Sequence, residues 1–249
     1  MRAVLYVSHG SRVKEGVDQA RFFIESCMEP LSVAIQEICF LELVKPSIKE
    51  GVERCIQQGA DEIIIQPVLL FAAGHVKKDI PEEVNKIKRL YPTIKFSYGK
   101  PFGQDARIID ILSERLHQSG TPLLGEAMIL LVGRGSSDPE IKENFEVISE
   151  AIWNKEGLPI QSCFLAACDP RLSDGLVLAQ KSGFRQVFVI PYLMFTGILM
   201  KDMKKAIRPY QSVNQTFFLC QSLGYHEKLK EVLIERVNGS LTAIKEVSL

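Results

Sequence analysis

Residues 39–51 read CFLELVKPSIKEG and recur as CFLAACDPRLSDG at residues 163–175, and this repetition decides the fold. Three further blocks match in the same chain order, at spacings of 121 to 125 residues: VSHGS at 7–11 with VGRGS at 132–136, IIIQPVLLF at 63–71 with VFVIPYLMF at 187–195, and LSER at 112–115 with LIER at 233–236. Ordered matches at nearly one spacing indicate an internal duplication. We therefore predict two domains, at residues 1–120 and 125–249, joined where glycine and proline cluster near residues 117–126.

Each half of the chain alternates apolar runs with stretches of helical periodicity. The expected strands lie at residues 3–8, 33–41, 63–70 and 93–98 in the first half, and near 127–132, 160–166, 186–193 and 215–220 in the second. Helices are expected between them, among them residues 16–27, 81–91, 106–117 and a helix that Pro46 opens and Gly59 closes. This order is typical of a parallel sheet covered by helices on both faces. We predict an α/β protein with two flavodoxin-like domains, each with a parallel four-stranded sheet, facing a central cleft.

Composition excludes several classes of protein. The 30 basic residues balance 30 acidic ones, which argues against nucleic acid or an anionic membrane surface as a partner. The longest nearly unbroken apolar stretch, residues 187–200, is interrupted by Pro191 and Gly197 and is too short to span a bilayer. The N-terminal apolar run is too short for a signal peptide, so we expect a cytoplasmic protein.

The six cysteines are scattered without a CxxC pair. Cys39, Cys163 and Cys220 lie inside apolar runs, so we expect buried thiols in a reduced protein. This pattern predicts no structural zinc or iron–sulfur site.

Polar residues follow the first three predicted strands of the first half. They are His9, Glu42 and His75, spaced 33 residues apart. Ligands of open parallel sheets bind beyond the carboxyl ends of the strands, and a flavodoxin-like strand order would place His9 between Glu42 and His75. Two imidazoles and a carboxylate suit a divalent transition metal or proton transfer. The other histidines, His117 and His226, lie at helix ends, where surface or capping roles are expected.

The second half serves as an internal control for this site. The counterparts of His9, Glu42 and His75 are Arg134, Ala166 and, with one gap, Ile198, and none of these is a usual metal ligand. We therefore expect one active site, carried by the first half. The second half is expected to form the opposite wall of the cleft.

Several residues near the strand ends could bind anions. GRGSSD at residues 133–138 is a glycine-rich turn into a helix, and such turns favour anionic groups through their backbone N–H groups. The turn lacks the spacing of the nucleotide-binding motifs. This absence weakens one possible function, that of a phosphate-ester or nucleotide enzyme. We expect these side chains to bind substrate carboxylates: Ser8, Ser11, Arg12, Lys77 and Lys78 in the first half, and Arg134, Ser136, Ser137, Lys201 and Lys205 in the second.

Three segments carry a resemblance to a known family. VSHGSR at 7–12, FLELVKPSI at 40–48 and LLFAAGHVKKDIP at 69–81 closely resemble the sirohydrochlorin chelatases, which are class II chelatases, and in particular their two-domain bacterial ferrochelatases. The resemblance covers essentially the whole chain. It implies two flavodoxin-like domains and ATP-independent insertion of ferrous iron into sirohydrochlorin to form siroheme. It also implies that His9 and His75 are the catalytic histidines and Glu42 their acidic partner.

The resemblance leaves other functions open. The same site could insert cobalt or nickel in a cobalamin-type pathway, because histidine and carboxylate ligands accept all these ions. A protein of another class, a carrier that binds a tetrapyrrole or a metal without turnover, is a further alternative. In each case the metal, Fe²⁺ or Co²⁺, would be a substrate and no tightly bound cofactor is expected. The cleft needs only one chain, so we expect a monomer or a weak homodimer.

Overall fold

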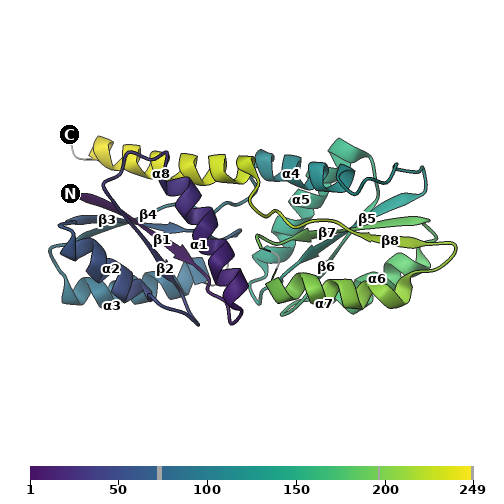
Figure 1. Ribbon diagram of the computed structural model, residues 1–249, viewed down its shortest axis with the longest axis horizontal. Coiled ribbons are helices and arrows are strands. Elements are labelled where there is room, and N and C mark those ends of the chain that lie inside the picture. Colours follow the sequence, from purple (N-terminus) through teal and green to yellow (C-terminus); the bar gives the residue numbers. More distant parts are fainter. Residues whose placement is uncertain (72–74, 196, 248–249) are drawn as a thin grey trace. The chain divides into compact units, whose positions relative to one another are not determined.

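The computed structural model describes residues 1–71, 75–195 and 197–247, with the side chains of residues 75–76 and 244–247 left out. Strands and helices alternate along the chain (Figure 1). In the first half they are β1 (Arg2–Ser8), α1 (Lys14–Met28), β2 (Ile35–Phe40), α2 (Ile48–Gln57), β3 (Glu62–Pro67), η1 (His75–Asp79), α3 (Ile80–Leu90), β4 (Lys95–Tyr98) and α4 (Ala106–His117). In the second half they are β5 (Ala127–Gly133), α5 (Glu140–Glu156), β6 (Ile160–Phe164), α6 (Leu172–Lys181), β7 (Gln186–Tyr192), α7 (Gly197–Ile207), η2 (Arg208–Tyr210), β8 (Thr216–Leu219) and α8 (Glu227–Val247).

The strands form two parallel four-stranded sheets of the same topology. Their orders are β2-β1-β3-β4 and β6-β5-β7-β8. Ser8 at the end of β1 pairs with Phe40 at the end of β2, and Val7 pairs with Pro67 at the end of β3. The carboxyl ends of the three strands therefore meet at one edge of the sheet. The predicted α/β class and the central position of the first strand are both confirmed.

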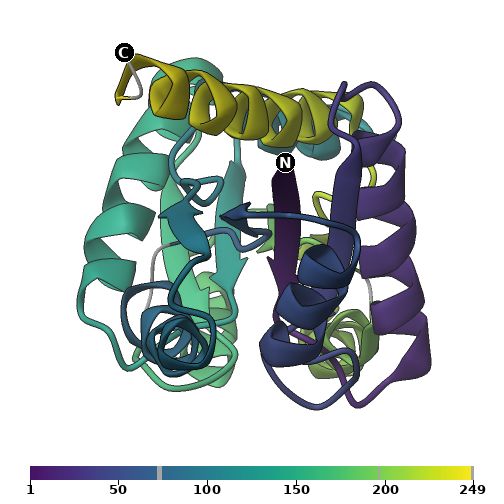
Figure 2. The same cartoon turned by 90° about the vertical axis from the view of Figure 1, so that its left-hand side faces the viewer.

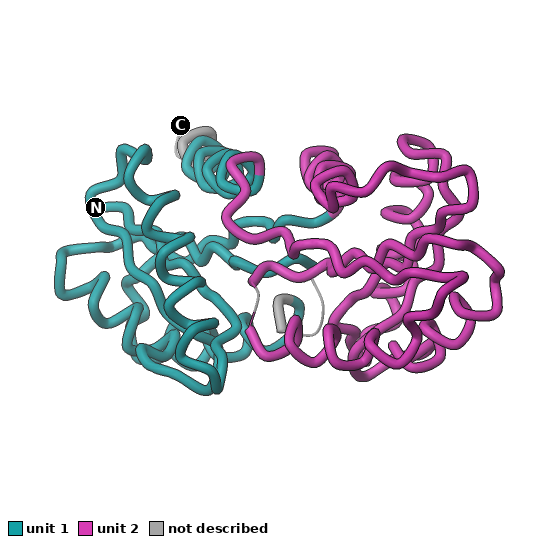
Figure 3. The backbone as a smooth tube through the Cα atoms, turned by 45° about the vertical axis from the view of Figure 1, so that its right-hand side comes forward, with its two compact units in different colours: residues 1–103, 229–249 teal, residues 104–228 magenta. Residues whose placement is uncertain are grey.

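The chain divides into two compact units whose boundaries differ from the predicted ones (Figure 3). Unit 1 contains residues 1–103 and 229–249, and unit 2 contains residues 104–228. The predicted ranges, 1–120 and 125–249, follow the sequence repeat. The units differ from the repeat because the last helix of each half of the sequence packs in the unit formed mainly by the other half. α4 belongs to unit 2, and nearly all of α8 belongs to unit 1.

Equivalent arginines attach the exchanged helices to their units. In unit 2, Arg115 of α4 donates to the carbonyl oxygens of Ser222 (2.8 Å) and Leu223 (3.0 Å). In unit 1, Arg236 of α8, its partner in the LSER/LIER match, donates to the carbonyl oxygen of Phe102 at 3.3 Å. Both units therefore have a contact between the exchanged helix and the segment that follows the fourth strand of the sheet, although the helix comes from the other half.

α8 also contacts the start of the first strand. Arg2 donates to the carbonyl oxygen of Leu241 at 3.3 Å, and Figure 2 shows α8 passing next to the N-terminal end of β1. Unit 1 is thus held together at this end by residues from both ends of the sequence.

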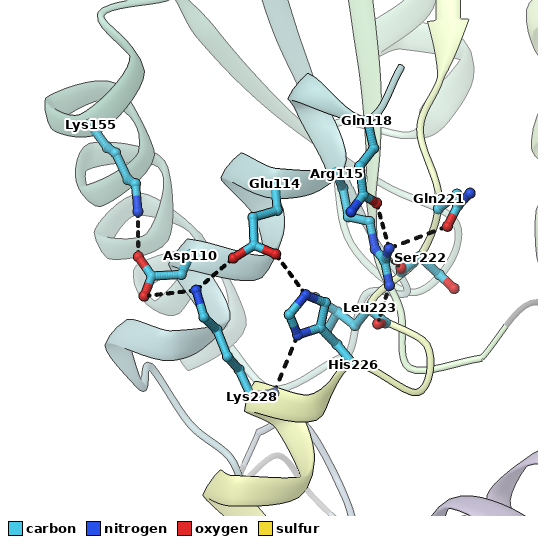
Figure 4. A network of polar contacts seen from close by, with 10 residues as sticks. All are labelled: Asp110, Glu114, Arg115, Gln118, Lys155, Gln221, Ser222, Leu223, His226 and Lys228. Atoms are coloured by element: carbon cyan, nitrogen blue, oxygen red, sulfur yellow. Dashed lines mark hydrogen bonds and ion pairs between the residues drawn. The ribbon is translucent and has the colours of Figure 1, made fainter. Parts of the chain in front are cut away.

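The two exchanged helices begin with the same kind of cap. Asp105 accepts a hydrogen bond from the backbone N–H of Arg107 at 3.1 Å, and His226 accepts one through Nδ1 from Lys228 at 3.3 Å. Nε2 of His226 lies 2.8 Å from Glu114, so this ring caps α8 and contacts α4 at once (Figure 4). The predicted capping role of His226 is confirmed. His117 is 56% exposed and lies 2.9 Å from Glu156, in agreement with its predicted surface position.

Each sheet packs one face against two helices of its own half. In unit 1, side chains of β1, β2 and β3 pack against α2 and α3, and the close approach of α2 needs Gly51, where a Cβ would press on Leu5 and Cys39. Cys39, Cys163 and Cys220 are buried, as predicted. α2 begins two residues after Pro46, because Ser47 caps it in a capping box with Glu50. No helix within the described residues has both the length and the apolar character needed to cross a membrane.

Candidate functional site

His9 and Glu42 leave neighbouring strands at the carboxyl edge of the unit 1 sheet and meet there. The β1–β2 pairing continues past the strand ends, since Leu41 N–H donates to Ser8 (2.8 Å) and Glu42 N–H donates to His9 (3.1 Å). His9 Nδ1 lies 3.3 Å from Glu42 Oε1. The structure therefore brings together two of the three residues that the sequence predicts for the site.

Gly10 makes this approach possible. Its φ is +95°, a left-handed conformation that favours glycine, and a Cβ at this position would overlap the carbonyl oxygen of Glu42. The glycine of the SHGS motif is therefore required by the geometry of the two loops.

The environments of the two side chains differ. His9 is 16% exposed and both of its ring nitrogens are shielded from solvent, whereas Glu42 is 47% exposed. Glu42 is accessible because β2 ends at Phe40 and Glu42 lies in the loop beyond it, although its sequence neighbours are apolar. A shielded imidazole beside an accessible carboxylate suits an ion that must arrive from solvent and then leave.

Unit 2 repeats the backbone of this site without its side chains. Leu165 and Ala166 N–H groups donate to Gly133 and Arg134, both at 2.9 Å, and Gly135 has φ +87° with the Ala166 carbonyl where its Cβ would be. Leu43 and Ala167, the next loop residues, share left-handed φ values of 69° and 64°. Each costs about 1–3 kcal/mol for a residue with a side chain. The left-handed residue is therefore a feature of the shared fold, whereas the imidazole and the carboxylate are present in unit 1 and not at the equivalent positions of unit 2.

His75 is the first residue of η1, and its side chain lies outside the described part of the chain, as do residues 72–74 of the preceding loop. The η1 segment is a π-helical turn that precedes α3, whereas the equivalent helix of unit 2, α7, begins at Gly197 as a regular α-helix. π-Helical turns inside helices are frequent at functional sites. The backbone thus distinguishes the His75 segment from its duplicate.

The predicted carboxylate-binding residues fall into three groups. Ser8 is only 6% exposed, which argues against its predicted contact with a substrate carboxylate. Ser11 and Ser136 accept hydrogen bonds from Val13 and Asp138 at 3.1 Å, so each hydroxyl shapes the turn before its helix. The remaining predicted side chains are exposed on their units: Arg12, Lys77, Lys78, Arg134, Ser137, Lys201 and Lys205.

An acidic pocket adjoins Glu42 in unit 1. Its volume is about 320 Å³, and it lies between the loop after β2 and the start of α3. Its lining consists of Leu41, Glu42, Ser47, Ile48, Asp79, Glu82, Glu83 and Lys86. The carboxylates of α3, Glu82 and Glu83, have no signal in the sequence that marks them as site residues. The KKDIPEE segment contains them, but only the fold brings α3 beside Glu42.

Thiolates are poor candidates for metal ligands in this protein. Burial raises the pKa of the Cys55, Cys163 and Cys220 thiols to about 12, and it also raises the pKa of Cys39. Among the side chains that the structure describes, no three histidine, cysteine or acidic groups converge on a closed metal site. Among the described residues, the His9–Glu42 pair is therefore an open arrangement and not part of a closed four-ligand structural site.

Comparisons with known proteins agree with this geometry. The CbiX family model matches residues 3–119 and again residues 128–240. The sirohydrochlorin ferrochelatase of Priestia megaterium is 48% identical over 244 residues, covering 98% of this chain and 92% of that protein. A sirohydrochlorin cobaltochelatase of the same species is 35% identical, covering 97% of this chain and 80% of that protein.

The fold comparison gives the same result. The solved structure of SirB from Bacillus subtilis with Fe3+ superposes with a TM-score of 0.87 and 37% identity, covering 96% of this chain and 95% of that one. The duplicated CbiX match covers both halves of the chain, as the sequence repeat does. The chain belongs to the CbiX family.

Proposed function

We propose that this protein is a sirohydrochlorin ferrochelatase, which inserts ferrous iron into sirohydrochlorin to form siroheme without ATP. The observation that carries the proposal is the His9–Glu42 pair, 3.3 Å apart in unit 1 and replaced by Arg134 and Ala166 on the same backbone in unit 2. The likeness to ferrochelatases over nearly the whole chain supports this metal and this macrocycle.

The reaction exchanges protons for a metal ion. One divalent ion enters the macrocycle, and the two pyrrole N–H groups each lose a proton. A carboxylate beside Nδ1 orients an imidazole and raises its basicity, as Glu42 is placed to do for His9. Nε2 of His9 is then the nitrogen that binds the incoming ion or accepts a pyrrole proton.

His75 and Glu42 complete the proposed set of ligands. His75 begins η1, the element that follows β3 along the chain, and we assign to it the second imidazole. The three ligands follow three strands at the carboxyl edge of one sheet. They would bind an ion that is a substrate and has to be released into the macrocycle. No resident cofactor is needed for this step.

The exposed cations are proposed to bind the macrocycle. Sirohydrochlorin carries eight carboxylates, and a cation near the site both attracts and orients such a polyanion. Of the predicted residues, Arg12, Lys77 and Lys78 are exposed cations of unit 1, Arg134, Lys201 and Lys205 are exposed cations of unit 2, and Ser137 adds an exposed hydroxyl. We further propose a cytoplasmic location and a functional monomer or weak homodimer.

Insertion of cobalt is the second candidate function. It is favoured by the cobaltochelatase of Priestia megaterium, which covers 97% of this chain. Histidine and carboxylate ligands do not select between Fe²⁺ and Co²⁺ by affinity alone, so the site leaves both reactions possible.

An anaerobic absorbance assay tests the proposal. Sirohydrochlorin is mixed with catalytic amounts of protein and either Fe²⁺ or Co²⁺, and loss of the free-macrocycle spectrum is followed. Faster multiple-turnover insertion with Fe²⁺ supports a ferrochelatase, whereas a preference for Co²⁺ assigns the second function. Binding of one macrocycle per protein with rates at the uncatalysed background would contradict both and indicate a carrier.

A further inference from the structure

Arg21 contacts the residues at both ends of the loop 41–44, which contains Glu42. It lies on α1, and its guanidinium carbon is 4.9 Å from the ring centroid of Phe40, the last residue of β2. Nη2 donates to the backbone carbonyl of Lys45 at 3.1 Å. Phe40 and Lys45 bracket residues 41–44, so a single planar group holds the segment in which Glu42 lies.

The loop does not need this arginine to fold. Within unit 1, Phe40 N–H donates to Pro46 (2.8 Å) and Val44 N–H donates to Glu42 (2.9 Å). In unit 2 the same bonds join Phe164 to Pro170 (2.9 Å) and Cys168 to Ala166 (2.8 Å). The backbone alone therefore closes the loop in both units.

Unit 2 has a glutamate where unit 1 has Arg21. At the 125-residue spacing that relates His9 to Arg134, Arg21 corresponds to Glu146 of α5. The ring that packs on Phe164, the equivalent of Phe40, is Phe145, with centroids 4.9 Å apart; it corresponds to Ala20 and is buried beside Gly133. A glutamate carboxylate at the matched position has no group that could donate to the loop carbonyl. The arginine is thus an added constraint, present in the unit with the His9–Glu42 pair and replaced in the unit without it.

We propose that Arg21 is a positioning residue for Glu42. It acts through the Lys45 carbonyl and the Phe40 ring, and it touches neither metal nor macrocycle. Leu43, next to Glu42, has a strained φ of 69°, and Glu42 itself is 47% exposed, so local packing does little to hold its carboxylate. The tether from Arg21 limits relaxation of this segment and keeps the carboxylate beside His9. The effect of Arg21 on turnover rests on the proposed function, whereas its effect on metal binding can be measured without the macrocycle.

The test compares Arg21→Met, Arg21→Lys and the matched control Arg54→Met. Methionine retains packing on Phe40 but loses the charge and the donor. Lysine retains the charge and the stem but cannot both stack as a plane and donate from a fixed fork. Arg54 lies on α2 of the same unit, is 54% exposed and forms an ion pair with Glu37 at 3.8 Å, so Arg54→Met removes the same charge without removing the contacts to Phe40 and Lys45. Co²⁺ affinity without macrocycle, turnover with sirohydrochlorin and Fe²⁺, and the thermal midpoint are measured for each.

We expect Arg21→Met to weaken Co²⁺ binding and to lower kcat by about 10- to 100-fold, the usual loss when a group that orients a metal ligand is removed. The KM for the macrocycle should stay unchanged, the thermal midpoint should fall by only a few degrees, and Arg21→Lys should lose less than Arg21→Met. Arg54→Met should match the wild type.

Two results would overturn the proposal: wild-type Co²⁺ affinity in both Arg21 variants, or equal losses in Arg21→Met and Arg54→Met. A wild type that binds Co²⁺ but never metallates sirohydrochlorin would instead refute the proposed function. In that case the Co²⁺ titration still decides whether Arg21 positions Glu42.

Discussion

Gly10 and Glu42 approach each other so closely that no side chain fits at position 10. A Cβ there would overlap the carbonyl oxygen of Glu42, and the φ of Gly10 is +95°. The same relationship joins Gly135 to Ala166 in unit 2. The crossing of these two loops is therefore a feature of the fold, which unit 1 uses to bring an imidazole to a carboxylate.

The first prediction concerns Gly10→Ala. This change adds a steric conflict with the Glu42 backbone to the cost of a left-handed alanine, which alone is about 1 kcal/mol. We expect a loss of unfolding free energy above that value and a large loss of turnover, measured by denaturant titration and by the absorbance assay.

Gly157→Ala is the matched control for this variant. Gly157 also has a positive φ, of 68°, but has nothing within 4 Å of a built Cβ. The Gly157→Ala variant should lose about 1 kcal/mol of unfolding free energy and keep the turnover of the wild type. Equal losses of turnover in the two variants would show that the Gly10–Glu42 approach has no special importance.

The second prediction transplants the pair into unit 2. Because the backbone is repeated, Arg134→His with Ala166→Glu should place an imidazole and a carboxylate at a similar separation. In a background that also carries His9→Ala and Glu42→Ala, we expect these changes to restore weak Co²⁺ binding, detected by titration. If the background with and without the transplant binds Co²⁺ equally poorly, the equivalence of the two loops is refuted.

The third prediction concerns the acid side of the stability profile. Hydrogen bonds from Lys228 (2.6 Å) and then from His226 lower the pKa of Glu114 below its ordinary value (Figure 4). A lowered pKa in the folded state stabilises the protein above the unfolded pKa, about 4.3 for glutamate, and this contribution is lost as pH falls through the folded value. Glu114→Gln should therefore lower the thermal midpoint at pH 7, and the difference should shrink below about pH 4.

Glu146→Gln, on the exposed face of α5, is the control for this measurement. Its midpoint should follow that of the wild type from pH 7 to pH 3. A Glu114→Gln difference that is the same at every pH would mean that the carboxylate contributes through packing and not through its charge.

The fourth prediction concerns thiol reactivity. Burial raises the pKa of four cysteines, and a thiol reagent attacks the thiolate. Cys168 is partly exposed, whereas the other five are buried. At neutral pH a maleimide should label Cys168 in the native protein and all six cysteines after denaturation, as read by mass spectrometry of the peptides. Rapid native labelling at Cys39 or Cys163 would contradict the burial.

Much of the fold follows from the sequence because the signals are local or repeated. The α4 helix has the predicted ends, Ala106 and His117, since Asp105 caps it and its apolar residues keep one period. The duplicated blocks predict two sheets of one topology, and the structure has them. Strand ends are less predictable: the apolar run of 33–41 continues past β2, because Leu41 extends the pairing to β1 without forming a regular strand.

The exchange of the last helices could not be predicted from these signals. The LSER and LIER blocks place α4 and α8 correctly in the repeat, but a helix surface does not specify which half it will cover. Contacts such as Arg115 with Leu223 and Arg236 with Phe102 connect residues more than 100 positions apart. A boundary inferred from the repeat alone therefore assigns both helices to the half that encodes them.

The site was only partly predictable for a similar reason. His9 and Glu42 are predictable because parallel strands end at one edge of the sheet, a rule that needs only the strand order. The burial of Ser8 and the role of Arg21 depend on how α1 packs against the sheet, which the sequence pattern does not fix.

The central claim is that the His9–Glu42 pair of unit 1 carries out metal insertion. The most direct measurement is the anaerobic rate of Fe²⁺ insertion into sirohydrochlorin by wild type, His9→Ala and Glu42→Ala, beside His117→Ala as a histidine control. We expect both site variants to remain folded and to lose at least about 100-fold in turnover, with His117→Ala close to wild type. Wild-type rates in folded His9→Ala and Glu42→Ala would contradict the account.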